Sequence, residues 1–399
     1  MKVYLIGTGM GGAGTLTAEA RDAIAASDAF IGAARVLESV KDSGKPMYVS
    51  YKPVEIAEYL SEHSEYSSVS VLLSGDTSFY SGAKKLRDRL SGYEIITLPG
   101  ISTLSYMCAK LGIAAEDTDV VSLHGIDKSI VCRVRDSRYT FALLGRAADA
   151  LRICSELGEY GAECRVYIGS RLGYEDERII TTAPESYTGE AADPAAVIIE
   201  NCSPKCLLGK HPSDGDFIRG KVPMTKESVR ALVLAALDPD RESVIYDIGS
   251  GTGSISIALS LISHDITVYA VERGEEALRL TEENRRKFLA DNVRIVGGDA
   301  PAALEKLPAP DRVFIGGSGG NLREIIEAVL GKNGDAKIVL TAVTLETLSE
   351  TVRIAERLRL SCETSLISAA RSRNAGRSTL ILGENPVYIF TLRRMSDDE

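Results

Sequence analysis

Residues 244–253 read VIYDIGSGTG, an apolar strand that runs directly into a glycine-rich turn. A second stretch of the same kind, residues 3–12, reads VYLIGTGMGG. Glycines at the end of a strand let the backbone approach a ligand closely, and a helix is expected to follow each turn. Two such turns, so far apart in the sequence, predict two cofactor sites in two fused α/β domains.

Bulk composition is that of a globular protein with more than one domain. The chain has 399 residues, of which 44% are hydrophobic and 26% are charged. A net charge of −10 gives no general attraction to nucleic acid or to an anionic membrane surface. No apolar run is long enough to span a bilayer, and a strand starts at the N-terminus where a signal peptide would lie. Seven scattered cysteines fit neither a disulfide framework nor a metal site, so we expect a cytoplasmic protein without a metal.

Short apolar strands alternate with amphipathic helices along most of the chain, which indicates α/β sheets. The first part divides into two halves near the polar, basic loop 124–138. Residues 203–222 are rich in turn formers and lack periodicity, so they are predicted to be a linker. The expected domains are therefore 1–203 and 223–399, joined by residues 204–222, and Thr225 is expected to cap the first helix after the linker.

Acidic side chains follow three successive strands of the second domain. Glu272 ends the strand 266–271 and can accept from both ribose hydroxyls, and Asp299 follows the strand 293–296 and can accept from an adenine amino group. Asp247, before the first glycine, suits a cofactor with a cationic amino-acid end better than a pyrophosphate. This pattern resembles the class I S-adenosyl-L-methionine methyltransferases; an NAD site and a ligand-free α/β domain are the alternatives. The predicted cofactor-binding residues are Thr225, Asp247, Gly249, Ser250, Gly251, Thr252, Gly253, Glu272, Asp299 and Ala300.

Four further segments stand in order in the second domain. They are 221–227 (KVPMTKE), 298–301 (GDAP), 314–320 (FIGGSGG) and 341–347 (TAVTLET). Together they resemble the precorrin-6B methyltransferases that act at C-15 and decarboxylate the C-12 acetate. The resemblance implies that the acceptor approaches Gly317, Ser318 and Gly319, whose small size leaves room for a broad flat ring. Two arginine groups are candidate clamps for substrate carboxylates, or else solvated faces: Arg371, Arg373 and Arg377, and separately Arg133, Arg135 and Arg138.

The first domain carries a different set of motifs. Gly7, Gly9 and Gly12 satisfy a GxGxxG pattern, but the second strand ends without the acid that NAD binding needs. Segments 72–80 (LLSGDTSFY), 98–104 (LPGISTL), 121–125 (VSLHG) and 171–177 (RLGYEDE) resemble the tetrapyrrole (class III) methyltransferases that act at C-5 of precorrin-6B. The resemblance implies a two-lobed domain with the donor in the cleft between its halves, and predicts the cofactor-binding residues Gly7, Gly9, Gly75, Asp76, Ser102 and Thr103. Helix capping by Ser102 and Thr103, a turn-forming role for Asp76, and a merely structural His124 are the alternatives.

The combined resemblance implies a bifunctional S-adenosyl-L-methionine-dependent C-methyltransferase of the corrin pathway. It would methylate C-5 and C-15 of precorrin-6B, or of its cobalt form, and decarboxylate the C-12 acetate to give a precorrin-8. A tetrapyrrole substrate, no nucleic-acid or membrane partner, and a homo-oligomer are expected. A cobalt-specific version, a dinucleotide-dependent oxidoreductase and a donor-binding sensor are the alternatives, and the residues that catalyse the reaction are not assigned.

Overall fold

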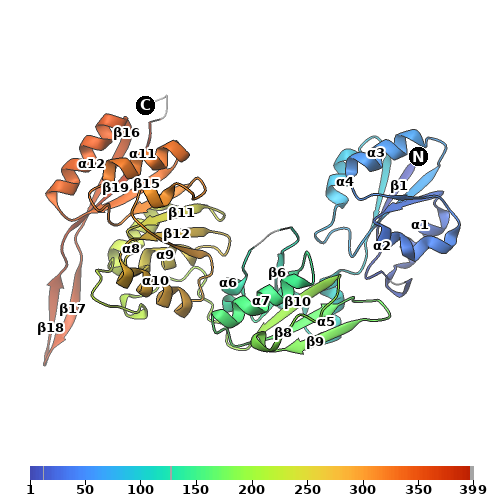
Figure 1. Ribbon diagram of the computed structural model, residues 1–399, viewed down its shortest axis with the longest axis horizontal. Helices are drawn as coiled ribbons and strands as arrows, with labels where there is room; N and C mark the ends of the chain where they lie inside the picture. The colour runs from blue at the N-terminus through green and yellow to red at the C-terminus, as the bar shows by residue number, and fades with distance from the viewer. Residues whose placement is uncertain (12, 126–127, 396–399) are drawn as a thin grey trace. The chain divides into compact units, whose positions relative to one another are not determined.

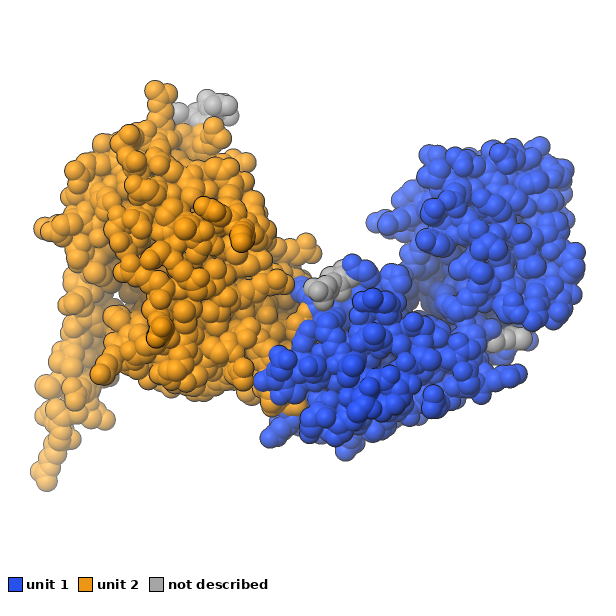
Figure 2. All heavy atoms as spheres, viewed as in Figure 1, with its two compact units in different colours: residues 1–128, 137–159, 163–204 blue, residues 129–136, 160–162, 205–399 orange. Residues whose placement is uncertain are grey.

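The computed structural model describes residues 1–11, 13–125 and 128–395, and the chain divides into two compact units (Figure 2). Unit 1 comprises residues 1–128, 137–159 and 163–204. Unit 2 comprises residues 129–136, 160–162 and 205–399. Gly12, part of the glycine pattern in the first domain, lies outside the described residues.

Unit 1 begins with a five-stranded parallel sheet in the order β3-β2-β4-β1-β5. Its strands are β1 (Lys2–Gly7), β2 (Ala29–Gly32), β3 (Met47–Val49), β4 (Ser68–Leu73) and β5 (Glu94–Leu98). The helices are α1 (Ala18–Ala26), α2 (Ala34–Leu37), α3 (Pro53–Glu62), α4 (Ala83–Arg89) and α5 (Thr103–Leu111), with 3-10 turns η1 (Ala13–Thr15) and η2 (Glu38–Ser43). Central strands read as nearly continuous apolar runs because helices cover both faces of the sheet.

A second five-stranded sheet of unit 1 has the order β6-β7-β10-β8-β9. Only β6 and β7 pair in parallel, and the other neighbours are antiparallel. The strands are β6 (Thr118–Ser122), β7 (Tyr139–Leu143), β8 (Cys164–Ser170), β9 (Arg178–Thr182) and β10 (Ala195–Asn201). They are accompanied by α7 (Ala148–Glu159) and by the 3-10 turns η3 (Ala115–Asp117) and η4 (Pro184–Ser186).

Unit 2 contains a seven-stranded sheet in the order β13-β12-β11-β14-β15-β19-β16. The first five strands of this order are parallel, and β19 runs antiparallel to both its neighbours. The strands are β11 (Val244–Ile248), β12 (Thr267–Glu272), β13 (Val293–Gly297), β14 (Arg312–Ile315), β15 (Lys337–Ala342), β16 (Leu360–Ile367) and β19 (Val387–Arg394).

Helices cover both faces of this sheet. On one face pack α8 (Glu227–Leu237), α9 (Ser254–Ser260) and α10 (Glu275–Lys287), and on the other α11 (Leu322–Lys332) and α12 (Leu345–Leu358). The remaining elements of the unit are α6 (Val131–Asp136), η5 (Asp214–Asp216) and η6 (Ala302–Leu304). A two-stranded ribbon of β17 (Ala370–Ala375) and β18 (Ser378–Gly383) projects from the sheet (Figure 1), and every residue of its strands is exposed.

The α/β architecture expected from the alternation is confirmed, but several details differ. The second sheet of unit 1 already begins at β6, so the two halves divide before residue 118 and not in the loop 124–138. Within that loop, residues 129–136 belong to unit 2, where they form α6. The segment expected to be a linker packs onto unit 2 from residue 205, and Phe217 is buried against Phe288. Thr225 does not cap α8, because the helix starts one residue later, behind Lys226, without a side-chain cap.

Candidate functional site

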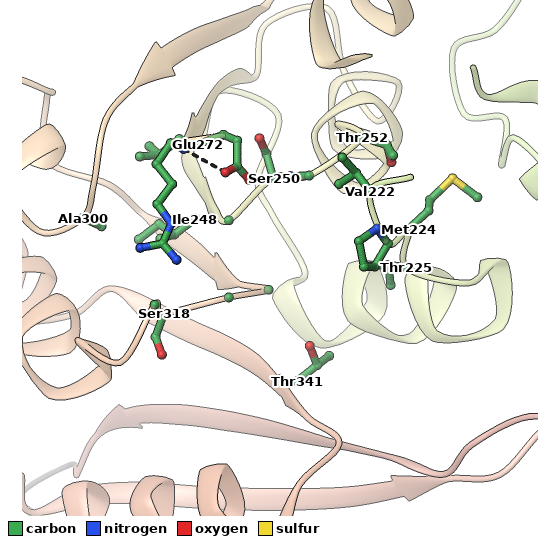
Figure 3. A pocket seen from close by; sticks show the side chains of 18 of the residues that line it. Val222, Met224, Thr225, Ile248, Ser250, Thr252, Glu272, Ala300, Ser318 and Thr341 are labelled. Atoms are coloured by element: carbon green, nitrogen blue, oxygen red, sulfur yellow. Dashed lines mark hydrogen bonds between the residues drawn. The ribbon is translucent and has the colours of Figure 1, made fainter. Parts of the chain in front are cut away.

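Unit 2 holds a cavity of about 480 Å³ at the carboxyl ends of its parallel strands. Ser250, Glu272, Ala300, Ser318 and Thr341 surround it (Figure 3). This edge of a parallel sheet is where open α/β folds bind ligands, because the loops that leave the strands converge there. Of the predicted residues it collects Thr225, Gly249, Ser250, Gly251, Thr252, Glu272, Asp299, Ala300, Gly317, Ser318 and Gly319.

Two glycine-rich turns lie against each other in the wall of the unit 2 cavity. Gly249 has φ 72°, and a Cβ on it would lie 2.7 Å from the carbonyl oxygen of Gly317. No side chain therefore fits between the turn after β11 and the turn after β14. The consequence is a cavity wall made of bare backbone, which a ligand can approach closely.

Asp247 lies at the end of β11, fully buried and outside the cavity lining. Its Oδ2 accepts a hydrogen bond from Ser256, whereas its Oδ1 has no partner among the described residues. Burial raises the pKa of this carboxyl to about 7, against the lowering effect of the Ser256 hydrogen bonds. The buried hydroxyls of Ser250 and Thr252 are likewise without a partner in the described part of the chain. Buried polar atoms are normally satisfied, so this cluster is suited to a polar ligand.

Two acids stand at the rim of the same cavity. Glu272 accepts from the backbone N–H of Gly251 at 3.0 Å through Oε2 and from that of Gly274 at 2.9 Å through Oε1. Asp299 is exposed and pairs with Arg273, with 3.2 Å between Oδ1 and Nη1. Glu272 thus joins the glycine turn after β11 to the loop after β12, and both carboxylates stand next to the cavity.

Other predicted residues of the second domain lie elsewhere. Gly253 is the N-cap of α9, with Thr281 packed beside it, and does not line the cavity. Arg371 pairs with Asp214, Glu227 and Glu384, so its charge is already balanced at the base of the ribbon. Arg373 is exposed on β17 and does not line the cavity.

Two of the three arginines proposed as clamps in the loop 124–138 are held by protein partners. Arg135 is completely buried and donates to Asp136 and to the backbone carbonyl of Phe288. Arg133 pairs with Asp265 at 3.0 Å, and Arg138 lies over the ring of Tyr139. The protein partners of Arg135 and Arg133 argue against a clamp role for these two, whereas the candidate role of Arg138, which is exposed, stays a prediction.

A second cavity of about 480 Å³ lies in unit 1. It is lined by turns and helices that follow the strands of the first sheet and by residues of β7 and β10 in the second. Among the predicted residues it collects Gly75, Asp76 and Thr103, whereas Gly7, Gly9 and Ser102 lie outside its lining. Both Gly7 and Gly9 nevertheless lie against Gly75. Gly9 exchanges two backbone hydrogen bonds of 2.9 and 3.0 Å with it, and a Cβ on Gly7 would lie 2.8 Å from its carbonyl oxygen. Ser102 caps α5 by accepting from the N–H of Ser105, which confirms a capping role for it.

The Asp76 carboxylate holds two turns together and also lines the cavity. Its Oδ2 accepts from the N–H of Gly100 at 2.9 Å and its Oδ1 from the N–H of Ser78 at 2.7 Å. Burial opposes ionisation, but these hydrogen bonds outweigh it and keep the pKa of Asp76 below its ordinary value. The carboxylate therefore fixes the turn after β4 against the turn after β5 and remains charged beside the cavity.

Several residues that line the two cavities were not predicted from the sequence motifs. In unit 2 these include Arg273, Val343 and Val387, and in unit 1 they include Arg35 and Tyr80. Arg273 directly follows Glu272, and Val343 lies inside a quoted motif, so proximity to the motifs was a usable signal. Arg35 and Val387 lie outside all of the motifs.

Comparison with known proteins assigns a family to each part of the chain. The family model described as tetrapyrrole (corrin/porphyrin) methylases matches residues 2–186, and the one described as precorrin methyltransferase domain matches residues 217–394. A Sinorhizobium precorrin-6Y C(5,15)-methyltransferase [decarboxylating] is 30% identical over 387 residues, which cover 94% of this chain and 92% of that protein. The chain belongs to the precorrin-6Y C(5,15)-methyltransferase family.

Other relatives match about half of this chain. A Salmonella typhimurium cobalt-precorrin-6B C(15)-methyltransferase (decarboxylating) is 36% identical over 183 residues, 45% of this chain and 93% of that protein. A solved precorrin-6Y C5,15-methyltransferase structure from Geobacter metallireducens is 38% identical, with a TM-score of 0.44, and covers 47% of this chain and 97% of that one. The expected fold class, a class III tetrapyrrole methylase domain followed by a class I methyltransferase domain, is confirmed.

As a family member, the chain is a methyltransferase that uses S-adenosyl-L-methionine as methyl donor. The unit 2 cavity fits this donor, since it combines unsatisfied buried oxygens, bare backbone and two acids at the rim. The unit 1 cavity also presents bare backbone, because a Cβ on Gly75 would meet no described atom within 4 Å. None of the described helices is long and apolar enough to cross a membrane.

Proposed function

We propose that unit 1 methylates C-5 of precorrin-6B and that unit 2 methylates C-15 and decarboxylates the C-12 acetate. Each unit would take its own donor molecule. The observation that carries this proposal is a pair of separate cavities, one in each unit and each lined only by residues of that unit. A chain that used one active site for both methylations would need only one of these cavities.

Different residues of unit 2 would bind different parts of the donor. Glu272 would bind the ribose hydroxyls, Asp299 the adenine amino group, and Asp247 with Ser250 and Thr252 the cationic amino-acid end. In unit 1 the corresponding residues are Gly75, Asp76 and Thr103. When bound, the donor supplies an electrophilic methyl group.

The protein contributes alignment and the exclusion of water. The meso carbon of a reduced tetrapyrrole is enamine-like and can attack without a strong base, so the rate depends on holding the two reactants in line. Gly316, Gly317 and Gly319 leave one wall of the unit 2 cavity without side chains, which gives a flat macrocycle room beside the glycine turn after β11. Decarboxylation uses the ring system of the substrate as electron sink, so no protein nucleophile is needed.

Two forms of the substrate, without and with cobalt, are candidates, because relatives are named for each of them. The full-length relative is named for precorrin-6Y and the shorter one for cobalt-precorrin-6B. We therefore include the cobalt form as the second candidate substrate. Comparison of kcat/KM for the two forms under anaerobic conditions decides between them.

The test of the proposed function uses a donor labelled with ¹³C in its methyl group. Incubation with precorrin-6B is expected to give two new methyl resonances, at C-5 and C-15, together with the mass change for loss of CO₂. The Asp247→Asn variant should lose the C-15 signal and keep the C-5 signal. Loss of both signals in that variant, or no methyl transfer by the wild type to either form of the substrate, would refute the division of labour.

Two further expectations belong to this proposal. A homo-oligomer is supported by Leu380, Ile381 and Leu382, consecutive apolar residues on the ribbon that are 49%, 78% and 44% exposed. Exposed apolar runs of this kind usually meet a partner surface, and light scattering in solution would show a mass above one chain. A cytoplasmic location stays a prediction, which fractionation of the source cells would check.

A further inference from the structure

The unit 1 cavity contains an arginine that the proposed function has not yet used. Arg35 lies on α2, is exposed and lines the cavity. Its Nη1 donates to the hydroxyl of Tyr174 at 2.6 Å and its Nη2 to the hydroxyl of Ser74 at 3.0 Å. Both partners are neutral, so they orient the guanidinium without balancing its charge.

The two carboxylates that line the cavity with Arg35 accept hydrogen bonds from other groups. Asp76 lines the same cavity but accepts from Ser78 and Gly100. Asp193 also lines it and accepts from the N–H of Ala147. Within the described residues, no carboxylate lies within ion-pair distance of Arg35, whereas the nearby Arg171 pairs with Asp176. Arg35 therefore brings to the cavity a positive charge that no ion pair among the described residues neutralises.

Tyr174 is itself held in place. Its ring lies under the guanidinium of Arg171, 4.7 Å from the ring centroid. Its hydroxyl passes so close to the glycine turn after β1 that a Cβ on Gly11 would lie 2.7 Å from it. A side chain packed in this way gives Arg35 a fixed neighbour, which reduces the entropy lost when the guanidinium binds an anion.

Apolar side chains form much of the remaining lining. Phe79, Leu143, Leu144 and Leu172 line the cavity together with Tyr80, which is 57% exposed. Such a lining suits the faces of a flat macrocycle but offers nothing to its charged arms. The combination of an apolar wall and one unbalanced guanidinium fits an apolar ring that carries a carboxylate at its edge.

We propose that Arg35, oriented by Tyr174 and Ser74, binds a side-chain carboxylate of the tetrapyrrole and thereby positions C-5 in unit 1. This inference rests on the proposed function of unit 1 and extends it to substrate recognition. A guanidinium pairs with a carboxylate through two parallel hydrogen bonds, which fixes orientation as well as position. The methyl donor also carries a carboxylate, so the test must distinguish the two sources of this group.

The experiment compares Arg35→Gln, Arg35→Lys and Tyr174→Phe with the control Arg87→Gln, an exposed arginine of α4 outside the cavity lining. All are made in the full chain, and C-5 and C-15 methylation are followed separately by ¹³C resonance. Arg35→Gln should raise KM for the macrocycle in C-5 methylation by about 10- to 100-fold, the range of a lost charge-assisted pair. Tyr174→Phe and Arg35→Lys should raise this KM by about 3- to 10-fold. Each variant keeps the positive charge but loses the oriented, bidentate geometry of the guanidinium.

Three readouts keep the proposal open to refutation. The C-15 reaction and the donor affinity, measured by calorimetry, should stay within about twofold of the wild type, a change too small to report a lost contact. A macrocycle with its carboxylates converted to amides should react equally with wild type and Arg35→Gln. An unchanged macrocycle KM in Arg35→Gln overturns the proposal, and a donor affinity that falls in step with KM reassigns the carboxylate to the donor. Failure of the proposed function would be visible already in the wild type, which would then give no C-5 signal.

Discussion

Asp247 is a fully buried carboxyl whose ionisation opposes folding. Its pKa of about 7 in the folded chain lies above that of an unfolded aspartate, about 4. Between these two values the folded chain binds one proton more than the unfolded chain. The stability due to the protonated form is therefore complete below about pH 4 and is lost as the pH rises through about 7.

We predict that Asp247→Asn stabilises unit 2 at pH 8 by about 1–2 kcal/mol in the absence of donor, because the buried charge is removed. At pH 5, where the wild-type carboxyl is protonated, the gain should vanish or reverse. Urea unfolding at the two pH values, followed by a probe in unit 2, measures this. A variant that is less stable than the wild type at pH 8 and equal to it at pH 5 would contradict the prediction. Ser256→Ala serves as control, because it keeps the carboxyl and removes its hydrogen-bond donor.

At the scale of elements, the turns after β1, β4 and β5 meet in unit 1 with no space for a side chain. A Cβ on Gly100 would lie 2.3 Å from the carbonyl oxygen of Gly75 and 2.6 Å from that of Gly7. We predict that Gly100→Ala destabilises unit 1 by about 3 kcal/mol or more and abolishes C-5 methylation, since backbone must move to relieve the overlap. Thermal unfolding and the ¹³C assay measure the two effects.

The matched control is Gly82→Ala at the start of α4. A Cβ there would meet no described atom within 4 Å, and the residue has helical angles. Its stability should be unchanged or raised by about 0.5 kcal/mol, because alanine restricts the unfolded chain. Equal losses in the two variants would mean that the crossing of the three turns is not the cause.

The elements also show what the sequence can and cannot predict. Strand β11 and its turn were predictable, because an apolar run that ends in glycines specifies both a buried strand and a ligand edge. Strands β17 and β18 were missed because their residues are all exposed, so no burial periodicity marks them. Arg35 was missed for a similar reason: its role depends on Tyr174 from a distant turn, and short-range spacing carries no trace of such a contact.

At the scale of the whole molecule, a segment from within the N-terminal half of the sequence belongs to unit 2. Asp291 accepts from the N–H groups of Val131 and Cys132, at 2.9 and 2.8 Å. Asp136 accepts from Arg135 and from His264, and these bonds outweigh burial and keep its pKa well below the ordinary value. The short helix α6 is thus tied to other parts of unit 2 by charged side chains at both of its ends.

We predict that Arg135→Met destabilises unit 2 by about 3 kcal/mol, since it leaves the carbonyl of Phe288 and the carboxylate of Asp136 without their buried cation. Hydrogen exchange should rise in residues 284–293, although the substitution lies more than a hundred residues earlier in the sequence. The control Arg138→Met, at an exposed arginine over Tyr139, should change stability by less than about 1 kcal/mol. Faster exchange confined to unit 1 would show that α6 does not support unit 2.

The chain passes from one unit to the other at 128/129, 136/137, 159/160, 162/163 and 204/205. Segments of the two units thus alternate along one polypeptide. A single cut near residue 210 would leave residues 129–136 on the N-terminal fragment while their contacts remain on the other. Such a cut would separate Asp291 from the N–H groups of Val131 and Cys132, so a free-standing C-terminal fragment would expose a carboxylate that needs new polar partners.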